Sequence, residues 1–178
     1  ALQSVIREPS ALGFHPRKRV LVVFIDGLGY QNLLAAKGHA PFLASLAEKG
    51  QILHAAFPST TSVNITSFAT GLTPGEHGII GHVVKDRYFQ YSMNLLNGWS
   101  EETDPRLWQP NQTISEFALA SGVVTNVVSS EEYRNTGFTG ATMRSAQFRA
   151  ADDLAARFEL ARKILEENET SVNYLYVQ

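Results

Sequence analysis

The chain has 178 residues, of which 44% are hydrophobic and 18% charged, and its formal net charge is −2 at pH 7. These values are typical of a folded globular protein and exclude a disordered chain, and the absence of a basic stripe argues against binding to a nucleic-acid polymer. The sequence contains no cysteine, which excludes disulfides, thiolate metal sites and cysteine nucleophiles.

The first residues show no targeting signal. Arg7 and Glu8 interrupt any apolar stretch that could form a signal peptide, and no window holds the ~20 apolar residues that a membrane-spanning helix needs. We therefore expect no membrane association and a cytoplasmic location. The short basic run over residues 17–19 is interpreted as the solvated start of a strand.

The first half of the chain predicts two strands and three helices. The apolar run VLVVFI over residues 20–25 predicts a strand buried on both faces, as in a parallel sheet. Residues 30–49 are predicted to be helical, with an interruption at Pro41, which suits the first turn of a second helix. A short strand is predicted over residues 51–55, and a further helix over residues 61–70.

The second half continues this alternation. Residues 113–120 predict a helix in which Thr113 is the N-cap and Glu116 completes a capping box. Residues 123–128 and 171–177 predict two more strands of the buried type.

A longer helix is predicted between these last two strands, over residues 151–168. Because strands and helices alternate, we predict an α/β fold with a mostly parallel sheet and helices on both faces. The buried face of the longer helix is predicted from apolar residues that recur at helical spacing. These residues are Leu154, Phe158, Ala161 and Leu165.

Residues 82–112 break the alternation of strands and helices. We interpret them as an insertion over the carboxyl edge of the sheet, where open α/β folds bind ligands. Tyr88 or Trp99 could stack on a nucleobase, but a small packed cluster is favoured because aromatic residues usually pack. The aromatic residues of the segment are Tyr88, Phe89, Tyr91, Trp99 and Trp108.

The strand over residues 20–25 ends in Asp26 and Gly27. A carboxylate at the end of a buried strand needs a partner or a metal ion to stay ionised, and a glycine permits a sharp turn. Two interpretations stay open for these residues: a metal ligand, or an ordinary Asp-Gly turn.

A second signal lies in residues 57–79, FPSTTSVNITSFATGLTPGEHGI, where four hydroxyl residues (59–62) stand at the predicted start of a helix. Helix N-termini hold anions through unpaired N–H groups, so a hydroxyl there can bind or attack phosphate. The alternative is that Thr60 or Thr61 only caps the helix. Asn64, one turn further, either reaches the phosphate site or faces solvent.

His77 lies in the turn that follows this helix. A lone histidine is weak evidence for a metal site. We therefore favour a histidine that braces the loop by hydrogen bonds over a metal ligand.

Taken together, VLVVFIDGLG (residues 20–29) and residues 57–79 resemble the alkaline phosphatase superfamily, and most closely its type I phosphodiesterase/nucleotide pyrophosphatase family. The resemblance is specific over residues 20–82. It implies an alkaline phosphatase-like fold in which residues 1–178 form the N-terminal portion of a single α/β domain, with the insertion at about 82–112.

The resemblance also implies a mechanism. In this family a strand-end Asp and a Thr bind one of two divalent metal ions, with zinc as the expected metal, and these ligands correspond to Asp26 and Thr61. In the pattern Pro-x-x-Thr, counted from Pro58, the nucleophile corresponds to Thr61. Its oxygen would attack phosphorus in a small-molecule phosphoester and form a phosphothreonyl intermediate, which water then hydrolyses.

Two departures from the family pattern affect the site. His82 stands near the position at which nucleotide pyrophosphatases commonly carry a phosphate-binding Asn, so His82 and Asn64 are the candidate substrate-binding residues. The remaining metal ligands, which are Asp and His residues in the family, are expected beyond Gln178.

Several other functions stay open. Within the superfamily the alternatives are a phosphomonoesterase, a phosphonate hydrolase or a phosphomutase. The sequence PSTT lacks the Arg and the residue order of a sulfatase motif. Outside the enzymes, a non-catalytic binding module that retains the fold is the alternative. The sequence carries no signal for the oligomeric state.

Overall fold

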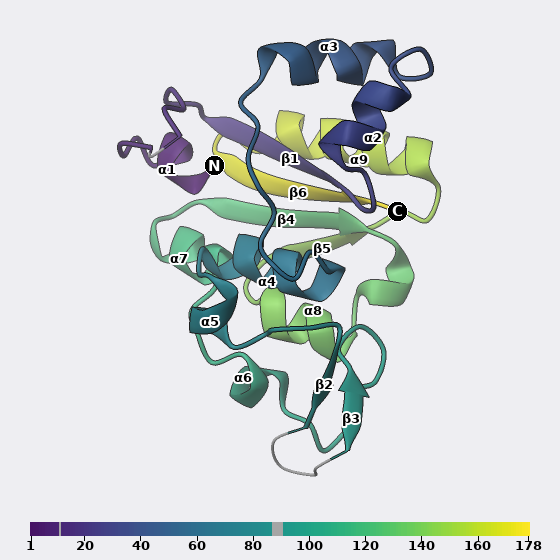
Figure 1. Ribbon diagram of the computed structural model, residues 1–178. Helices are drawn as coiled ribbons and strands as arrows, with labels where there is room; N and C mark the ends of the chain where they lie inside the picture. Colours follow the sequence, from purple (N-terminus) through teal and green to yellow (C-terminus); the bar gives the residue numbers. More distant parts are fainter. Residues whose placement is uncertain (11, 87–90) are drawn as a thin grey trace.

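The computed structural model describes residues 1–10, 12–86 and 91–178, which form an α/β fold (Figure 1). The helices are α1 (Leu2–Val5), α2 (Tyr30–Ala35), α3 (Pro41–Lys49), α4 (Thr61–Thr70), α5 (Pro74–His77), α6 (Pro105–Trp108), α7 (Ile114–Ala120), the 3₁₀ helix η1 (Glu131–Tyr133), α8 (Gly137–Thr142) and α9 (Leu154–Glu167). The strands are β1 (Arg19–Ile25), β2 (Val83–Lys85), β3 (Ser92–Asn94), β4 (Val124–Ser129), β5 (Gln147–Ala150) and β6 (Ser171–Val177). None of these helices combines the length and the apolar character that crossing a membrane requires.

Four strands form a parallel sheet in the order β1-β6-β4-β5. The pairing of β1 with β6 runs from Arg19 opposite Ser171 to Ile25 opposite Val177, and β4 pairs in parallel with both β6 and β5. The predicted mostly parallel sheet is therefore confirmed. A separate antiparallel pair, β2 with β3, lies outside this sheet.

Helices cover both faces of the sheet, as predicted (Figure 1). Successive side chains of a strand point to opposite faces, so neighbouring residues of β6 join different clusters. Leu175 lies in a buried cluster with Ile164 of α9. Tyr174 lies in another cluster with Val63 of α4 and Phe138 of α8. The sheet is thus enclosed between α9 and the pair α4 and α8.

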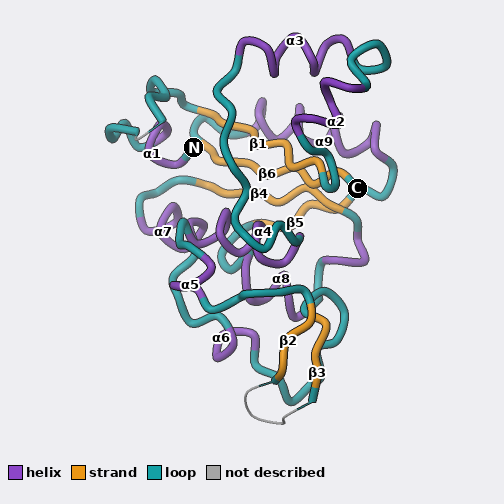
Figure 2. The backbone as a smooth tube through the Cα atoms, in the orientation of Figure 1, coloured by secondary structure: helices purple, strands orange, loops and turns teal. Residues whose placement is uncertain are grey.

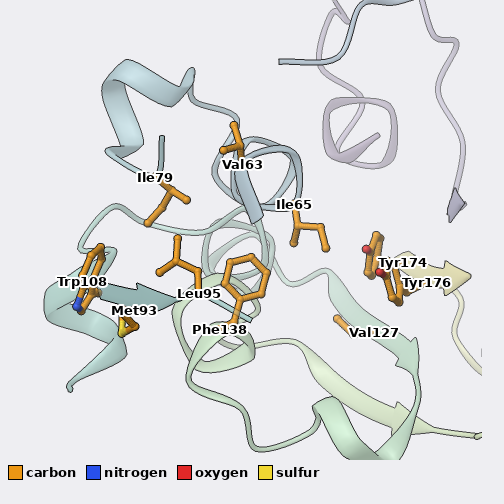
Figure 3. Close-up of a cluster of buried hydrophobic side chains, with 10 residues drawn as sticks. All are labelled: Val63, Ile65, Ile79, Met93, Leu95, Trp108, Val127, Phe138, Tyr174 and Tyr176. Carbon is orange, nitrogen blue, oxygen red and sulfur yellow. The ribbon is translucent and has the colours of Figure 1, made fainter. Parts of the chain in front are cut away.

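The 82–112 segment extends the core on the side of α4 and α8 (Figure 3). It contains β2, β3 and α6, and it contributes Met93, Leu95 and Trp108, which are all at most 3% exposed. Trp99 packs on Trp108, with 6.1 Å between ring centroids. The packed cluster that we favoured for the aromatic residues is confirmed for this pair.

The structure confirms most of the predicted elements and their ends. Helices α2 and α3 are separate, and Pro41 is the first residue of α3. Helix α4 ends at Gly71, whose φ of 73° is left-handed. The capping box of α7 joins Thr113 and Glu116 as predicted.

Three predictions were wrong in detail. Residues 51–55 are loop and not strand (Figure 2), because they pair with no strand among the described residues and lead from α3 to α4 instead. Strand β1 is only half-buried, and Val23 is 40% exposed. Among the described residues β1 pairs with one strand, β6, so it lies at the edge of the sheet that they form.

The third error concerns the buried face of α9. Leu154 and Phe158 are exposed, whereas Arg157, Ala161 and Ile164 are buried. The buried face of α9 therefore differs from the predicted one, and it includes the charged residue Arg157. Its guanidinium donates to three backbone carbonyls, those of Ala151, Asp152 and Tyr176, which satisfies the buried group.

Candidate active site

Asp26 and Thr61 lie side by side at the carboxyl edge of the sheet. The Thr61 hydroxyl donates to the Asp26 carboxylate, with Oγ1 3.1 Å from Oδ2 and 3.3 Å from Oδ1. Thr61 is the first residue of α4, and the preceding Thr60 is the N-cap, without a side-chain capping bond. The hydroxyl of Thr61 is therefore not used to cap the helix, and it stands at the end where the helix dipole is positive.

The backbone places Asp26 at this position. Its N–H donates to the Val177 carbonyl at 2.8 Å, which continues the β1–β6 ladder by one residue. Gly27 then has a φ of 68°, so the chain turns sharply away from the strand. The carboxylate is thereby held at the strand end while the chain continues to α2.

Tyr176 also contacts the candidate site, and no sequence motif pointed to it. Its hydroxyl donates to Asp26 Oδ2 at 2.5 Å, from the strand next to β1. Burial of the side chain, together with this hydrogen bond and the charge of Asp26, raises the pKa of Tyr176 above its usual range. The phenol therefore stays protonated and acts as a donor. Its one sequence signal is its place near the end of an apolar strand.

Asn64 braces the loop that leads into α4. Its Oδ1 accepts from the Ala56 N–H at 2.8 Å, and its Nδ2 donates to the carbonyls of Thr60 and Ala56 at 3.1 and 3.4 Å. The amide is thus engaged with the backbone next to the site.

His77 is buried and braces the turn after α4. Nδ1 accepts from the Ile79 N–H at 3.1 Å, so Nε2 carries the proton and donates to Ser67 Oγ at 2.9 Å. Burial lowers the pKa of His77, and the charge of Glu76 raises it by less. The lowered pKa favours the neutral ring. These hydrogen bonds agree with the favoured interpretation, in which His77 braces the loop.

His82 lies near the site but outside its cavities. Its backbone carbonyl accepts from Leu95 N–H at 2.9 Å. The neighbouring Gly81 carbonyl accepts from Ser62 Oγ at 2.9 Å, which ties this chain segment to α4. His82 is not among the described residues that line the two cavities next to Thr61.

These two cavities open on either side of the Asp26–Thr61 pair. One, of about 570 Å³, is a broad groove between the turn after β1 and the loop before α4. The other, of about 180 Å³, lies between the sheet, α4 and α8, and is mostly apolar. Tyr174 and Tyr176 line the smaller cavity. Tyr88, a candidate for stacking, lies outside the described residues.

The site offers oxygen ligands of the type that divalent metal ions bind. The Asp26 carboxylate and the Thr61 hydroxyl are close enough to share one ion. Within residues 1–10, 12–86 and 91–178, no group of three or more His, Asp or Glu side chains surrounds a common point. The described residues thus fit part of a metal site and not a complete one.

The parallel sheet, its two helical layers and the carboxylate–hydroxyl pair at the carboxyl edge define an α/β fold of the alkaline phosphatase type. The chain matches the family described as Type I phosphodiesterase / nucleotide pyrophosphatase over residues 20–172. The protein belongs to this family, as the resemblance predicted.

Solved structures share the fold at low sequence identity. Phosphonoacetate hydrolase from Sinorhizobium meliloti 1021, in complex with phosphonoacetate, is 21% identical with a TM-score of 0.63, and the match covers 90% of this chain and 46% of that one. Murine ectonucleotide pyrophosphatase / phosphodiesterase 5 is 17% identical with a TM-score of 0.63, covering 89% and 43%. The chain therefore spans about half the length of these structures.

Proposed function

We propose that the protein is a metal-dependent phosphoester hydrolase of the phosphodiesterase/nucleotide pyrophosphatase type, with Thr61 as its nucleophile. The observation that carries the proposal is the 3.1 Å distance between Thr61 Oγ1 and the Asp26 carboxylate at the first turn of α4. Membership of the family supports the reaction class.

Thr61 and the start of α4 would perform the chain's part of the reaction. Thr61 Oγ1 attacks phosphorus, an O–P bond forms, and the bond from phosphorus to the leaving alcohol breaks. Water then cleaves the phosphothreonyl ester and regenerates the hydroxyl. The unpaired N–H groups of the first turn of α4 would stabilise the charge on the phosphoryl oxygens.

The proposed cofactors are two divalent metal ions, with zinc as the expected ion. Asp26 and Thr61 would hold one of them, and Tyr176 would hold the carboxylate of Asp26 in place. When bound there, the ion would lower the pKa of the Thr61 hydroxyl and make it a better nucleophile.

The proposed substrate is a small-molecule phosphoester. A phosphonate hydrolase is the second candidate, because the phosphonoacetate hydrolase shares the fold over 90% of this chain. Turnover of bis(4-nitrophenyl) phosphate, 4-nitrophenyl phosphate and phosphonoacetate by one preparation would distinguish a diesterase, a monoesterase and a phosphonate hydrolase.

A pair of adjacent threonine variants tests the nucleophile. In the full-length protein we expect Thr61→Ala to lower kcat on bis(4-nitrophenyl) phosphate by roughly 10³-fold or more, as loss of a covalent nucleophile does. Thr60→Ala is the matched control, because the Thr60 side chain makes no capping bond, and it should keep most of the rate. Equal losses in the two variants would exclude Thr61 as the nucleophile.

A further inference from the structure

The smaller cavity next to Thr61 is large enough to hold an aromatic-sized group. Its volume of about 180 Å³ is close to that of a cavity of about 150 Å³ that binds benzene. Its apolar walls include Ile65 of α4, Val127 of β4, and Phe138 and Met143 at the two ends of α8. Because Asp26 and Thr61 line the same cavity, a group attached to a phosphorus atom at Thr61 can enter it.

The threonine hydroxyls in the wall are already used by the fold. Thr139 Oγ1 donates to the Tyr133 carbonyl at 2.6 Å, and Thr142 Oγ1 donates to the Phe138 carbonyl at 2.8 Å. Thr136 Oγ1 lies within hydrogen-bond distance of the Tyr133 carbonyl, at 3.3 Å. Because these three hydroxyls already bond to the backbone, the cavity wall is less polar than these three threonines would suggest.

The hydroxyl of Tyr174 differs from them. Tyr174 is 5% exposed, and no residue in the described part of the chain hydrogen-bonds its buried hydroxyl oxygen. The ring is fixed by Phe24, Phe68 and Tyr176, with centroids at 5.9, 5.2 and 6.4 Å. In Figure 3 the oxygen ends of Tyr174 and Tyr176 lie on the side of Ile65, a residue of the cavity wall.

A buried hydroxyl without a partner is unfavourable unless a ligand or water satisfies it. Tyr176, its neighbour on the same face of β6, already donates to Asp26. Tyr174 therefore offers an unused donor in the wall of an apolar cavity that Asp26 and Thr61 also line.

We propose that Tyr174 is a specificity-determining residue: its hydroxyl donates to an acceptor on an aromatic-sized, otherwise apolar organic group of the substrate, which occupies this cavity. The inference rests on the proposed function for the position of the phosphorus atom. It adds the substrate class, a phosphoester or phosphonate whose organic group carries one buried acceptor such as a carbonyl oxygen.

Three phosphonates separate the contributions of the phosphoryl group, the ring and the acceptor. Methylphosphonate needs only the phosphoryl site, phenylphosphonate also fills the cavity, and 4-acetylphenylphosphonate adds a carbonyl acceptor. Calorimetry on the full-length holoenzyme gives a Kd for each. We expect the acetyl compound to bind about 3- to 10-fold more tightly than the phenyl compound, as one net hydrogen bond allows.

Tyr174→Phe should reduce this ratio to about one and leave methylphosphonate binding unchanged, because the ring stays in the aromatic cluster. Tyr133→Phe is the matched control: Tyr133 lines the same cavity, but its hydroxyl already accepts from Gln178 Nε2 and donates to the Glu132 side chain, so the ratio should persist. Leu96→Trp, at a half-buried wall position, should fill the cavity and weaken both aryl ligands far more than methylphosphonate.

The proposal is overturned if wild type does not prefer the acetyl compound, if the preference survives in Tyr174→Phe, or if that variant weakens all three ligands equally. Hydrolysis of bis(4-nitrophenyl) phosphate is measured in parallel. Hydrolysis that depends on Thr61, combined with an unchanged ratio in Tyr174→Phe, would contradict this inference and leave the proposed function standing. If the preference for the acetyl compound depends on Tyr174 but the protein hydrolyses no phosphoester, the proposed function is contradicted and this inference stands.

Discussion

Two hydroxyl groups from different elements meet at one carboxylate. Thr61 of α4 and Tyr176 of β6 both donate to Asp26. Two donors restrict the rotation of the carboxylate, so its orientation is fixed before any ion or substrate arrives. The residues that act on Asp26 are thus about 35 and 150 positions away in sequence.

The Tyr176 hydroxyl can be tested separately from Asp26 itself. We expect Asp26→Asn to abolish one high-affinity metal equivalent in the full-length protein, because the amide oxygen is a poor replacement for a carboxylate. Tyr176→Phe should weaken the same equivalent by roughly 10- to 100-fold, the usual effect of losing a group that orients a ligand. Competition with a chelating dye measures both. An unchanged metal affinity in Tyr176→Phe would exclude this positioning role.

The buried His77 predicts a dependence of stability on pH. Burial lowers its pKa below the usual 6.5, so below about pH 6.5 the unfolded chain binds a proton that the folded protein does not. Stability is therefore complete above this pH and decreases as the pH falls towards the folded-state pKa.

Urea unfolding at about pH 7.5 and pH 5.5 measures this contribution. We expect His77→Gln to be less stable than wild type at the higher pH, by about 1–3 kcal/mol for the buried hydrogen bonds. The variant should lose less stability than wild type on acidification, because its side chain does not titrate. Equal losses in the two proteins would show that His77 does not cause the pH dependence.

The residues of the site differ in how far the sequence could predict them. Asp26 and Thr61 stand in local patterns, a strand end and a helix start, so the sequence marked both as candidates, and the family resemblance implied that they share a metal ion. Tyr174 and Tyr176 depend on the pairing of β6 with β1, which joins chain segments about 150 residues apart. No local pattern encodes that pairing, and their roles appear only in the fold.

At the scale of elements, helix α8 connects the sheet to the 82–112 segment. Gly137 begins this helix, and a Cβ atom there would overlap the Trp99 ring. We expect Gly137→Ala to displace Trp99 and destabilise the protein by about 1–3 kcal/mol, as overpacking does.

Gly140, in the same helix, is the matched control. A Cβ there would meet Pro105 Cγ at 3.4 Å, an ordinary contact. Gly140→Ala should be neutral or stabilise the protein by up to about 1 kcal/mol through helix propensity. Thermal unfolding of the two variants measures the difference, and equal melting temperatures would contradict the close packing of Trp99 on α8.

Helices and strands with strong local sequence signals were predicted better than those whose structure depends on contacts with distant parts of the chain. The capping box of α7 and the Pro41 start of α3 are encoded within a few residues. The loop at residues 51–55 and the buried Arg157 of α9 are not, because each depends on what the rest of the fold places next to it. Strand β5 was also missed, since its four residues carry only a short apolar pattern.

At the scale of the whole molecule, the parallel sheet brings its strand ends together at one edge, where the proposed chemistry takes place. The groove of about 570 Å³ and the apolar cavity of about 180 Å³ meet there, at Asp26 and Thr61. The groove lies between the turn after β1 and the loop before α4, and the apolar cavity lies between α4, α8 and the sheet. This arrangement suits a phosphoryl group at the edge with an organic group in the apolar cavity.

The covalent step at Thr61 can be tested directly by acid quenching of the full-length protein during turnover of bis(4-nitrophenyl) phosphate, followed by mass spectrometry of the peptide that contains residues 59–62. We predict a 4-nitrophenyl phosphoryl group on Thr61. The same group on Thr60 or on a neighbouring serine, with Thr61 unmodified, would contradict it.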